Sequence, residues 1–429
     1  MLDIKLIRDN AEMIKANCQN RLAKVDIDLL LSLDLEVRDL KTLTEKARAE
    51  RNKISKTKPT PEIIEKMKKL GEDLKSKEDE LNNKEISFKE LLMAVPNLTH
   101  SDVKVSSDEN DNPVLKTYLG PTKFDFEPLD HVELAESLDL IDFDRATKVS
   151  GAKFYYLKNE LTFLELALIQ YALAISVKHG FIPYTTPDLA KREVLEGLGF
   201  KPRGESTQIY NIDDSDLCLI GTAEITMGGY HKNEVLPEES LPRKYVAVSH
   251  CFRTEAGSYS KFSKGIFRVH QFTKIEMFQC VKPEEAEKAH REILSIEEEI
   301  WQGLKIPYQV IDHCTADLGA PSIRTFDLEA WMPGKPASDG TQGAWAEITS
   351  TSNCTDYQSR GLNIKYSKNN GEKDFIYTLN GTAIAITRCL ISILENYQQK
   401  DGSVKIPKVL HDYLPKGMTI IKKKISAKI

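Results

Sequence analysis

The sequence predicts an α+β protein in which a long antiparallel α-helical hairpin precedes a larger domain built from strands and helices. Two observations predict the hairpin: a heptad spacing of seam residues between positions 33 and 95, and a proline-containing break inside it. A third observation concerns the stretch 245–278, whose side chains alternate with the period of two that strands impose. The 429 residues suffice for two or three domains.

The N-terminal hairpin rests on two runs of seam positions spaced alternately three and four residues apart. The first run consists of Leu33, Val37, Leu40, Thr44, Ala47, Arg51 and Ile54. The second run extends from Ile63 to Val95, and Pro59 and Pro61 separate the two. Two helices joined by a short turn fold back on each other, so we expect an antiparallel pair.

Basic residues predominate toward the tip of this hairpin, where positions 38–58 contain eight cations and three acidic residues. One interpretation is a solvated face of the coiled coil, which is what charge runs usually indicate. The other is contact with a phosphate backbone. No aromatic residue lies near the tip, which favours recognition of a double-stranded RNA helix by shape over base stacking. The candidate RNA-binding residues are Arg48, Arg51, Lys53 and Lys56.

The stretch 245–278 is interpreted as two strands joined by a long loop. One face of the first strand, Tyr245–Arg253, has small side chains and ends in an arginine, which suits a floor for a planar anion. The return strand, Phe267–Phe278, carries Arg268, His270, Lys274 and Glu276. Spacing alone also allows an edge hairpin with a solvated basic loop.

Further elements follow from apolar spacing and capping signals. A helix over Leu161–His179 ends at Gly180, and an extended segment follows up to Pro187. Thr222 is a predicted helix N-cap, and an amphipathic helix is expected from Pro283 to Gly303. A last helix is expected to start at Thr378 and run to Tyr397, with small residues and a positive helix end that favour a bound anion.

The segments FRTEAG (252–257) and FRVHQFTKIEMF (267–278) resemble motif 2 of class II aminoacyl-tRNA synthetases, specifically of bacterial-type seryl-tRNA synthetases. The resemblance covers nearly the whole chain, with motif 1 at about 161–190, motif 2 at about 245–278 and motif 3 at about 378–397. It implies an antiparallel β-sheet flanked by helices. It also implies a tRNA-binding hairpin domain (1–100), a connection (101–160) and a catalytic domain (161–429).

The resemblance also implies roles for individual residues. Catalysis is assigned to Arg253, Glu255 and Arg388. The implied ATP-binding residues are Arg253, Thr254, Glu255, Val269, Glu347, Ile348, Thr349, Ser350 and Arg388. The implied serine-binding residues are Thr222, Ala223, Glu224, Arg253, Glu276, Asn380 and Thr382. Glu347 and Ser350 are expected to face the magnesium ion of ATP, and Lys261 and Lys264 the tRNA acceptor end.

The implied activity is ATP-dependent formation of seryl-adenylate from L-serine, followed by transfer of serine to tRNA(Ser) and, as a further expectation, to tRNA(Sec). The resemblance implies a cytoplasmic homodimer that uses ATP with Mg²⁺. Seven scattered cysteines without a C-x-x-C pair predict neither a zinc site nor a disulfide framework. We expect no leader peptide and no segment long and apolar enough to span a membrane. The net charge of −6 confines any nucleic-acid contact to a local basic patch.

Some positions depart from the family pattern, and they keep alternatives open. Thr382-Ala383 stands where the family has Ser-Gly, Thr349 replaces a serine, Ala316 replaces a glycine and Gly361 replaces an arginine. The segment between Gly334 and Glu347 is also longer. The alternatives are a paralogue that activates an amino acid without charging tRNA, another class II synthetase, and an RNA-binding protein with an inactive catalytic fold.

Overall fold

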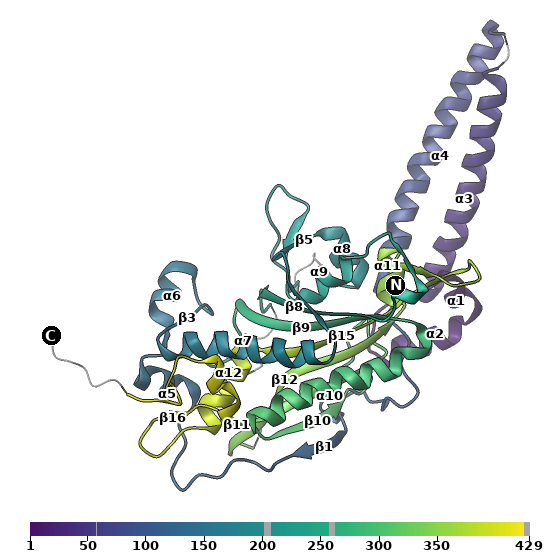
Figure 1. Cartoon of the computed structure of the whole chain (residues 1–429). Helices are drawn as coiled ribbons and strands as arrows, with labels where there is room; N and C mark the ends of the chain where they lie inside the picture. Colours follow the sequence, from purple (N-terminus) through teal and green to yellow (C-terminus); the bar gives the residue numbers. More distant parts are fainter. Residues whose placement is uncertain (57, 201–206, 257–261, 338, 424–429) are drawn as a thin grey trace. The chain divides into compact units, whose positions relative to one another are not determined.

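The computed structural model describes residues 1–56, 58–200, 207–256, 262–337 and 339–423, and these form two compact units, Met1–Leu98 and Thr99–Ile429. The first unit contains four helices, and its long pair is the predicted hairpin (Figure 1). Their bounds are α1 Ile4–Asp9, α2 Ala11–Asn20, α3 Ile27–Ile54 and α4 Pro61–Ala94.

Local sequence explains the ends and the seam of this hairpin. The Asp26 side chain caps α3 by accepting from the Leu29 amide, and Thr60 caps α4 with Pro61 at its first position. Among the predicted seam residues, Val37 and Ala47 are buried, whereas Arg51 is exposed. The heptad reading therefore holds in the body of α3 and weakens toward the turn.

The second unit is organised around an eight-stranded sheet with the order β1-β10-β11-β12-β15-β9-β8-β4. All neighbours are antiparallel except the last pair, in which β4 runs parallel to β8 at the edge of the sheet. The strands are β1 Val114–Tyr118, β4 Ile182–Thr185, β8 Arg243–Phe252, β9 Gln271–Val281, β10 Tyr308–Asp312, β11 Arg324–Pro336, β12 Gln342–Thr355 and β15 Tyr377–Ala385. The expected antiparallel sheet flanked by helices is confirmed.

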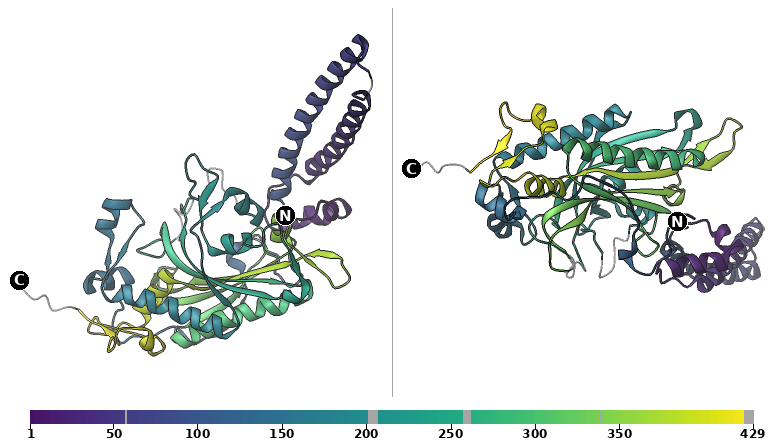
Figure 2. Two further views of the ribbon diagram at one scale, coloured as in Figure 1. Left: turned by 45° about the horizontal axis from the view of Figure 1, so that its top comes forward. Right: turned by 90° about the horizontal axis from the view of Figure 1, so that it is seen from below.

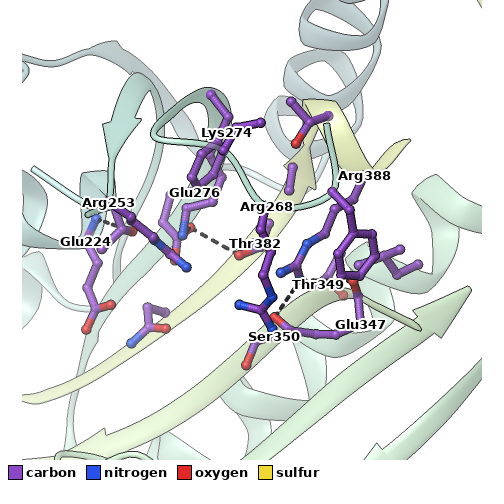
Figure 3. Close-up of a pocket in the computed structure, with 18 of the residues that line it drawn as sticks. Glu224, Arg253, Arg268, Lys274, Glu276, Glu347, Thr349, Ser350, Thr382 and Arg388 are labelled. Atoms are coloured by element: carbon purple, nitrogen blue, oxygen red, sulfur yellow. Dashed lines mark hydrogen bonds and ion pairs between the residues drawn. The ribbon is translucent and has the colours of Figure 1, made fainter. Parts of the chain in front are cut away.

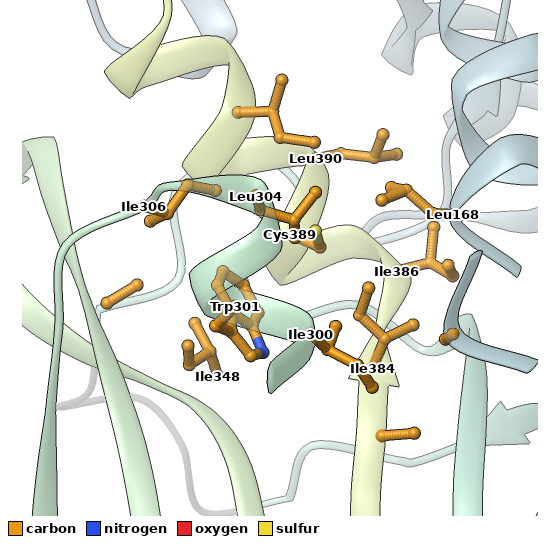
Figure 4. Packing of buried hydrophobic residues seen from close by; sticks show 14 of the residues in the cluster. Leu168, Ile300, Trp301, Leu304, Ile306, Ile348, Ile384, Ile386, Cys389 and Leu390 are labelled. Atoms are coloured by element: carbon orange, nitrogen blue, oxygen red, sulfur yellow. The ribbon is translucent and has the colours of Figure 1, made fainter. Parts of the chain in front are cut away.

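Three long helices pack on one face of this sheet: α7 Glu160–Lys178, α10 Ala286–Leu304 and α12 Ile386–Asn396 (Figure 2). Alternation along β9 separates the two faces, because Ile275 enters the main apolar core while Glu276 lines a cavity on the other side. Trp301 of α10 lies at the centre of that core with Ile300, Ile384 and Leu390 (Figure 4).

Smaller elements complete the second unit, and α8, α9 and α11 cover the opposite face together with a second apolar cluster. The remaining helices are α5 His131–Leu138, α6 Phe143–Ser150, α8 Arg192–Leu198, α9 Ala223–Gly229 and α11 Tyr357–Leu362. The remaining strands are β2 Ile141–Asp142, β3 Tyr156–Leu157, β5 Leu189–Lys191, β6 Leu217–Leu219, β7 Val235–Pro237, β13 Lys365–Ser367, β14 Lys373–Phe375, β16 Val404–Lys405 and β17 Ile420–Ile421.

Three predictions about elements were wrong. Residues from Thr378 to Ala385 belong to strand β15, and α12 begins only at Ile386, because β15 is hydrogen-bonded between β12 and β9. The return strand of the 245–278 stretch begins at Gln271, so Arg268 and His270 precede it. Helix α7 is long and apolar enough to cross a membrane by length and composition, contrary to expectation, although Leu164 and Leu168 of this helix enter the core.

Candidate active site

A cavity of about 410 Å³ opens on the sheet face opposite the long helices (Figure 3). Strands β9, β12 and β15 supply its floor, the start of α9 one end, and the first turn of α12 the other, and Arg253 enters it directly after the end of β8. It gathers most of the predicted ATP-binding and serine-binding residues: Thr222, Glu224, Arg253, Glu255, Val269, Glu276, Glu347, Ile348, Thr349, Ser350, Asn380, Thr382 and Arg388. Residues from segments far apart in the chain therefore converge on one site.

One end of the cavity is acidic and lies where α9 meets β9. The Lys274 ammonium contacts the Glu276 carboxylate at 2.5 Å, and the Thr382 hydroxyl donates to Glu276 at 3.3 Å. Glu224 follows Thr222, the confirmed N-cap of α9. Burial raises the Glu224 pKa to about 7, helped by the nearby Glu276 charge and opposed by Gln358, Lys274 and Arg253. This end can therefore receive a cationic group.

The other end of the cavity is cationic and contains Arg268 and Arg388, and Arg253 lies between the two ends (Figure 3). The Arg253 guanidinium lies 5.3 Å from the centre of the Phe272 ring, and its Nε donates to the Gly221 carbonyl at 3.3 Å. Arg388 lies 5.2 Å from the Phe267 ring centre. Arg268 pairs with the Glu255 carboxylate at 3.5 Å. Three guanidinium groups held by rings, carbonyls and a carboxylate form a preorganised site for a polyanion.

Glu347 on β12 is the carboxylate of the cationic end. One Oε1 atom lies 2.9 Å from Nη1 of Arg388, and the side chain is 47% exposed, so it still faces the cavity. Partial desolvation by the cavity walls opposes its ionisation, but Arg388 and Arg253 outweigh that effect and lower the Glu347 pKa. Among the described residues, no three His, Cys, Asp or Glu side chains cluster as a metal site. A carboxylate and the Ser350 hydroxyl lining one cavity suit a hard cation that brings its own phosphate oxygens.

Two of the predicted ATP-binding and serine-binding residues do not line the cavity. The Thr254 hydroxyl donates to the Thr207 carbonyl at 2.6 Å, outside the cavity, and Ala223 is fully buried in the first turn of α9. Conversely, Arg268 and Lys274 line the cavity although neither is among the predicted site residues. Their place beside Glu276 in the same motif was the signal that could have found them. The other lining residues, to which no role was assigned from sequence, are Phe200, Phe267, Phe272, Gly319, Ser352, Ala385 and Thr387.

The family departures have local structural explanations that leave the cavity intact. Ala383 occupies an irregular position of β15 and faces the main apolar core, so its methyl group stays outside the cavity. The Thr349 hydroxyl donates to the buried Glu297 carboxyl at 2.8 Å. The longer segment before Glu347 extends the β11–β12 hairpin while Glu347 stays paired with Glu329.

Gly361 is explained by its neighbour. A Cβ atom there would lie 1.9 Å from the carbonyl oxygen of Gly197, because α11 crosses α8 at these two glycines. An arginine at position 361 would push the two helices apart.

The predicted tRNA contacts lie outside the cavity. On the hairpin, Arg48 binds Glu78 at 2.8 Å, while Arg51, Lys53 and Lys56 are exposed. In the loop between β8 and β9, Lys261 lies outside the described residues, and Lys264 forms an ion pair with Asp130. Lys264 is therefore engaged with the N-cap of α5 in this structure.

Comparisons with known proteins agree with this geometry. The family described as tRNA synthetase class II core domain (G, H, P, S and T) matches residues 208–397, and the seryl-tRNA synthetase N-terminal domain matches residues 1–99. The chain is 50% identical to a serine--tRNA ligase of Treponema denticola, over 96% of this chain and 98% of that protein. It is 48% identical to that of Dictyoglomus thermophilum, over 99% of this chain and 100% of that protein.

Two solved structures extend this similarity to three dimensions. One is the seryl-tRNA synthetase of Pyrococcus horikoshii complexed with ATP, with a TM-score of 0.84 and 40% identity over 99% of this chain and 100% of that chain. The other is the cytoplasmic serine-tRNA ligase of Naegleria fowleri in complex with AMP, with a TM-score of 0.81 and 33% identity over 99% of each chain. The cavity, both family domains and these full-length similarities together show that the chain belongs to the seryl-tRNA synthetases.

Proposed function

We propose that this protein activates L-serine with ATP and transfers the serine to tRNA(Ser). The observation that carries the proposal is the charge division of one cavity, acidic at Glu224 and Glu276 and cationic at Arg268 and Arg388, with Arg253 between the two ends. An amino acid and a nucleoside triphosphate present the complementary charges. A cavity that places both along one floor brings the amino-acid carboxylate next to the phosphate chain.

In the first step, a carboxylate oxygen of serine attacks the α-phosphorus of ATP. The bond between that phosphorus and the bridging oxygen breaks, and pyrophosphate leaves with the electron pair. The nucleophile is already ionised, so no general base is needed, and catalysis rests on positioning and on charge neutralisation. Arg253 lies between the two ends and is assigned to the α-phosphate. Arg388 is assigned to the far phosphates, and Glu255 and Val269 to the adenine.

Magnesium is assigned to Glu347 and Ser350. The cation would supply charge compensation for the phosphate chain, and Glu347 already has the lowered pKa that a ligand carboxylate needs. Arg388 holds the Glu347 carboxylate in place through their ion pair. Ile348 and Thr349 complete this wall of the cavity.

The serine pocket is assigned to Thr222, Glu224, Glu276, Asn380 and Thr382, which converge at the acidic end. A pocket that hydrogen-bonds the substrate hydroxyl rejects alanine strongly, because its own polar groups would otherwise lose their partner. Rejection of threonine has to come from shape, since threonine keeps the hydroxyl and adds only a methyl group.

The second step and its partner involve the N-terminal unit. The terminal ribose hydroxyl attacks the carbonyl carbon of the adenylate, its proton is lost, and AMP leaves. We assign Arg51, Lys53 and Lys56, with Arg48, to contacts with the tRNA phosphate backbone, because they are exposed cations in the last turns of α3 and directly after its end. Residues 1–100 then form the tRNA-binding domain, 101–160 the connection and 161–429 the catalytic domain.

A homodimer is supported by an exposed apolar stripe on α7. Phe163, Leu166 and Val177 are exposed on this helix, and Ile182 is exposed on the neighbouring edge strand β4. Large exposed apolar side chains on adjoining elements indicate a protein contact. Sedimentation equilibrium should give twice the mass of one chain.

The bacterial relatives and the tRNA substrate support a cytoplasmic location.

ATP–pyrophosphate exchange tests the proposal directly, with each of the twenty amino acids in turn and no tRNA. Exchange driven by serine alone is expected. Exchange driven by another amino acid would overturn the serine assignment, and no exchange would favour the RNA-binding alternative. A second assay, charging of purified tRNA(Ser) and tRNA(Sec), then tests the transfer step.

A further inference from the structure

The second unit contains a buried carboxamide that the chemistry above does not use. Gln358, at the start of α11, is fully buried, and its Nε2 donates to Oε1 of Glu224 at 2.6 Å. Its Oε1 accepts from the Thr378 hydroxyl at 2.8 Å. Both polar atoms of the amide therefore have a partner. The series of hydrogen bonds from Thr378 through Gln358 leads to Glu224 at the acidic end of the cavity.

The direction of these two hydrogen bonds is the one that an ionised Glu224 requires. An ionised carboxylate can only accept, so the amide must turn its NH₂ group toward Glu224. Thr378 can donate to the amide oxygen that faces it, which holds the amide in this orientation. The reversed amide would place its oxygen against the Glu224 oxygen, an arrangement that only a protonated Glu224 could satisfy.

The elements on both sides of the amide are fixed. Thr378 lies on β15, paired with Cys280 of β9 and with Thr355 of β12. Helix α11 is packed against α8 at the contact between Gly361 and Gly197. Neither partner of the hydrogen-bonded chain can move far without disturbing the sheet or the helix crossing.

Glu224 differs from its neighbour Glu276 in the charge that faces it. Glu276 has an ion pair with Lys274, whereas no ion pair of Glu224 is present in the part of the chain that the structure describes. The charged groups around Glu224 are Glu276 and Lys274 on β9 and Arg253 beyond β8. Its direct partner Gln358 is neutral, so the charge of an ionised Glu224 remains available for a cation that enters the cavity.

We propose that Gln358 is a positioning residue for the amino-acid end of the cavity: its carboxamide, oriented by Thr378, presents Glu224 as the acceptor for the substrate ammonium group. The inference rests on the proposed function, because it takes the acidic end as the amino-acid site. Burial raises the Glu224 pKa to about 7, and the Gln358 hydrogen bond opposes that rise. The affinity for the amino acid should therefore fall as the pH decreases through about 7.

The test compares Gln358→Leu and Thr378→Val with the matched control Thr378→Ser, which keeps the hydroxyl. The assay is pyrophosphate exchange from pH 6 to pH 9, with KM determined for the amino acid and for ATP. Gln358→Leu should raise the amino-acid KM about tenfold, the loss expected for a hydrogen bond to a charged group. The midpoint of its pH dependence should move upward by about one pH unit. Thr378→Val should shift both in the same direction but less, and Thr378→Ser should match the wild type.

An unmoved pH midpoint in folded Gln358→Leu would overturn the inference, as would an ATP KM that changes as much as the amino-acid KM. If another amino acid drives exchange, the serine proposal fails, but the KM of that amino acid still tests whether Gln358 positions Glu224. If no amino acid drives exchange, the melting temperatures of Gln358→Leu and of the wild type test the role of Gln358 without an activity assay. The melting temperature of Gln358→Leu should then fall further below that of the wild type as pH rises through 7, because the lost hydrogen bond stabilised the ionised form of Glu224. A deficit independent of pH would refute the role.

Discussion

Glu224 and Glu347 are two carboxylates of one cavity whose pKa values are displaced in opposite directions. Burial opposes the ionisation of both. At Glu224 the direct partner is a neutral amide, so burial prevails and the pKa rises to about 7. At Glu347 two arginines outweigh burial and the pKa falls. The difference shows that neighbouring charges decide the protonation state at each end, and that the two ends are built for ligands of opposite charge.

The largest effect is expected from removing the arginine between the two ends. Arg253→Ala should lower the rate of pyrophosphate exchange by about 10³-fold, because it removes charge stabilisation at the reacting phosphorus. Binding of tRNA, measured by filter retention, should stay unchanged. Arg253→Lys serves as the control, since it restores the charge without the planar fork. Full exchange activity in Arg253→Ala would remove this residue from the mechanism.

A second substitution separates function from stability at the acidic end. Glu224→Gln should raise the serine KM by about 100-fold, since the substrate ammonium loses its uncompensated carboxylate. The same change should raise the melting temperature at pH 8. The folded-state pKa of Glu224 lies above that of the unfolded chain, so ionisation destabilises the fold fully above pH 7.

The increase in melting temperature caused by Glu224→Gln should become smaller as pH falls from 7 toward about 4.3, the pKa of a glutamate in the unfolded chain. Differential scanning fluorimetry across this range checks the sign. A gain that is equal at pH 4 and pH 8 would contradict the assigned burial effect.

A smaller effect is expected where Glu297 of α10 supports the wall between the ends. This carboxyl is fully buried, accepts from Thr349 and lies against Gly381, and burial holds its pKa well above the ordinary value. Glu297→Gln keeps shape and hydrogen bonding and should change the KM for ATP and for serine less than about threefold. Glu297→Leu leaves the Thr349 hydroxyl without its acceptor and should raise both KM values together.

The smallest effect on the cavity should come from the hairpin. Replacing Arg51, Lys53 and Lys56 together by glutamate should raise the tRNA KM at least about tenfold and reduce its salt dependence. Serine-dependent exchange without tRNA should stay at the wild-type rate. Reversal of the exposed acids Glu62, Glu65 and Glu72 on α4 to lysine provides a control in which the charge changes by the same amount with the opposite sign. A reduced exchange rate in the first variant would contradict the separation of the two units.

Periodic elements could be predicted from sequence, and long-range contacts could not. The hairpin follows from a local heptad repeat, and the cavity residues from motifs with fixed spacing. The start of α12 was misplaced because the strand character of 378–385 comes from two neighbouring strands, which no local pattern reveals. The contact of Gln358 could not be predicted for the same reason, since its partner Glu224 lies 134 positions away.

The contact between Gly361 and Gly197 has an evolutionary consequence. Because a Cβ at position 361 would lie only 1.9 Å from the Gly197 carbonyl oxygen, any side chain gained at this position requires the two helices to move apart. The clash is with backbone atoms that every residue has, so the constraint on position 361 comes from the close approach of the two helices and holds whichever residue stands at position 197. The same crossing fixes the helix that carries Gln358. A lineage that changed either glycine would therefore alter the substrate pocket without mutating any residue that lines it.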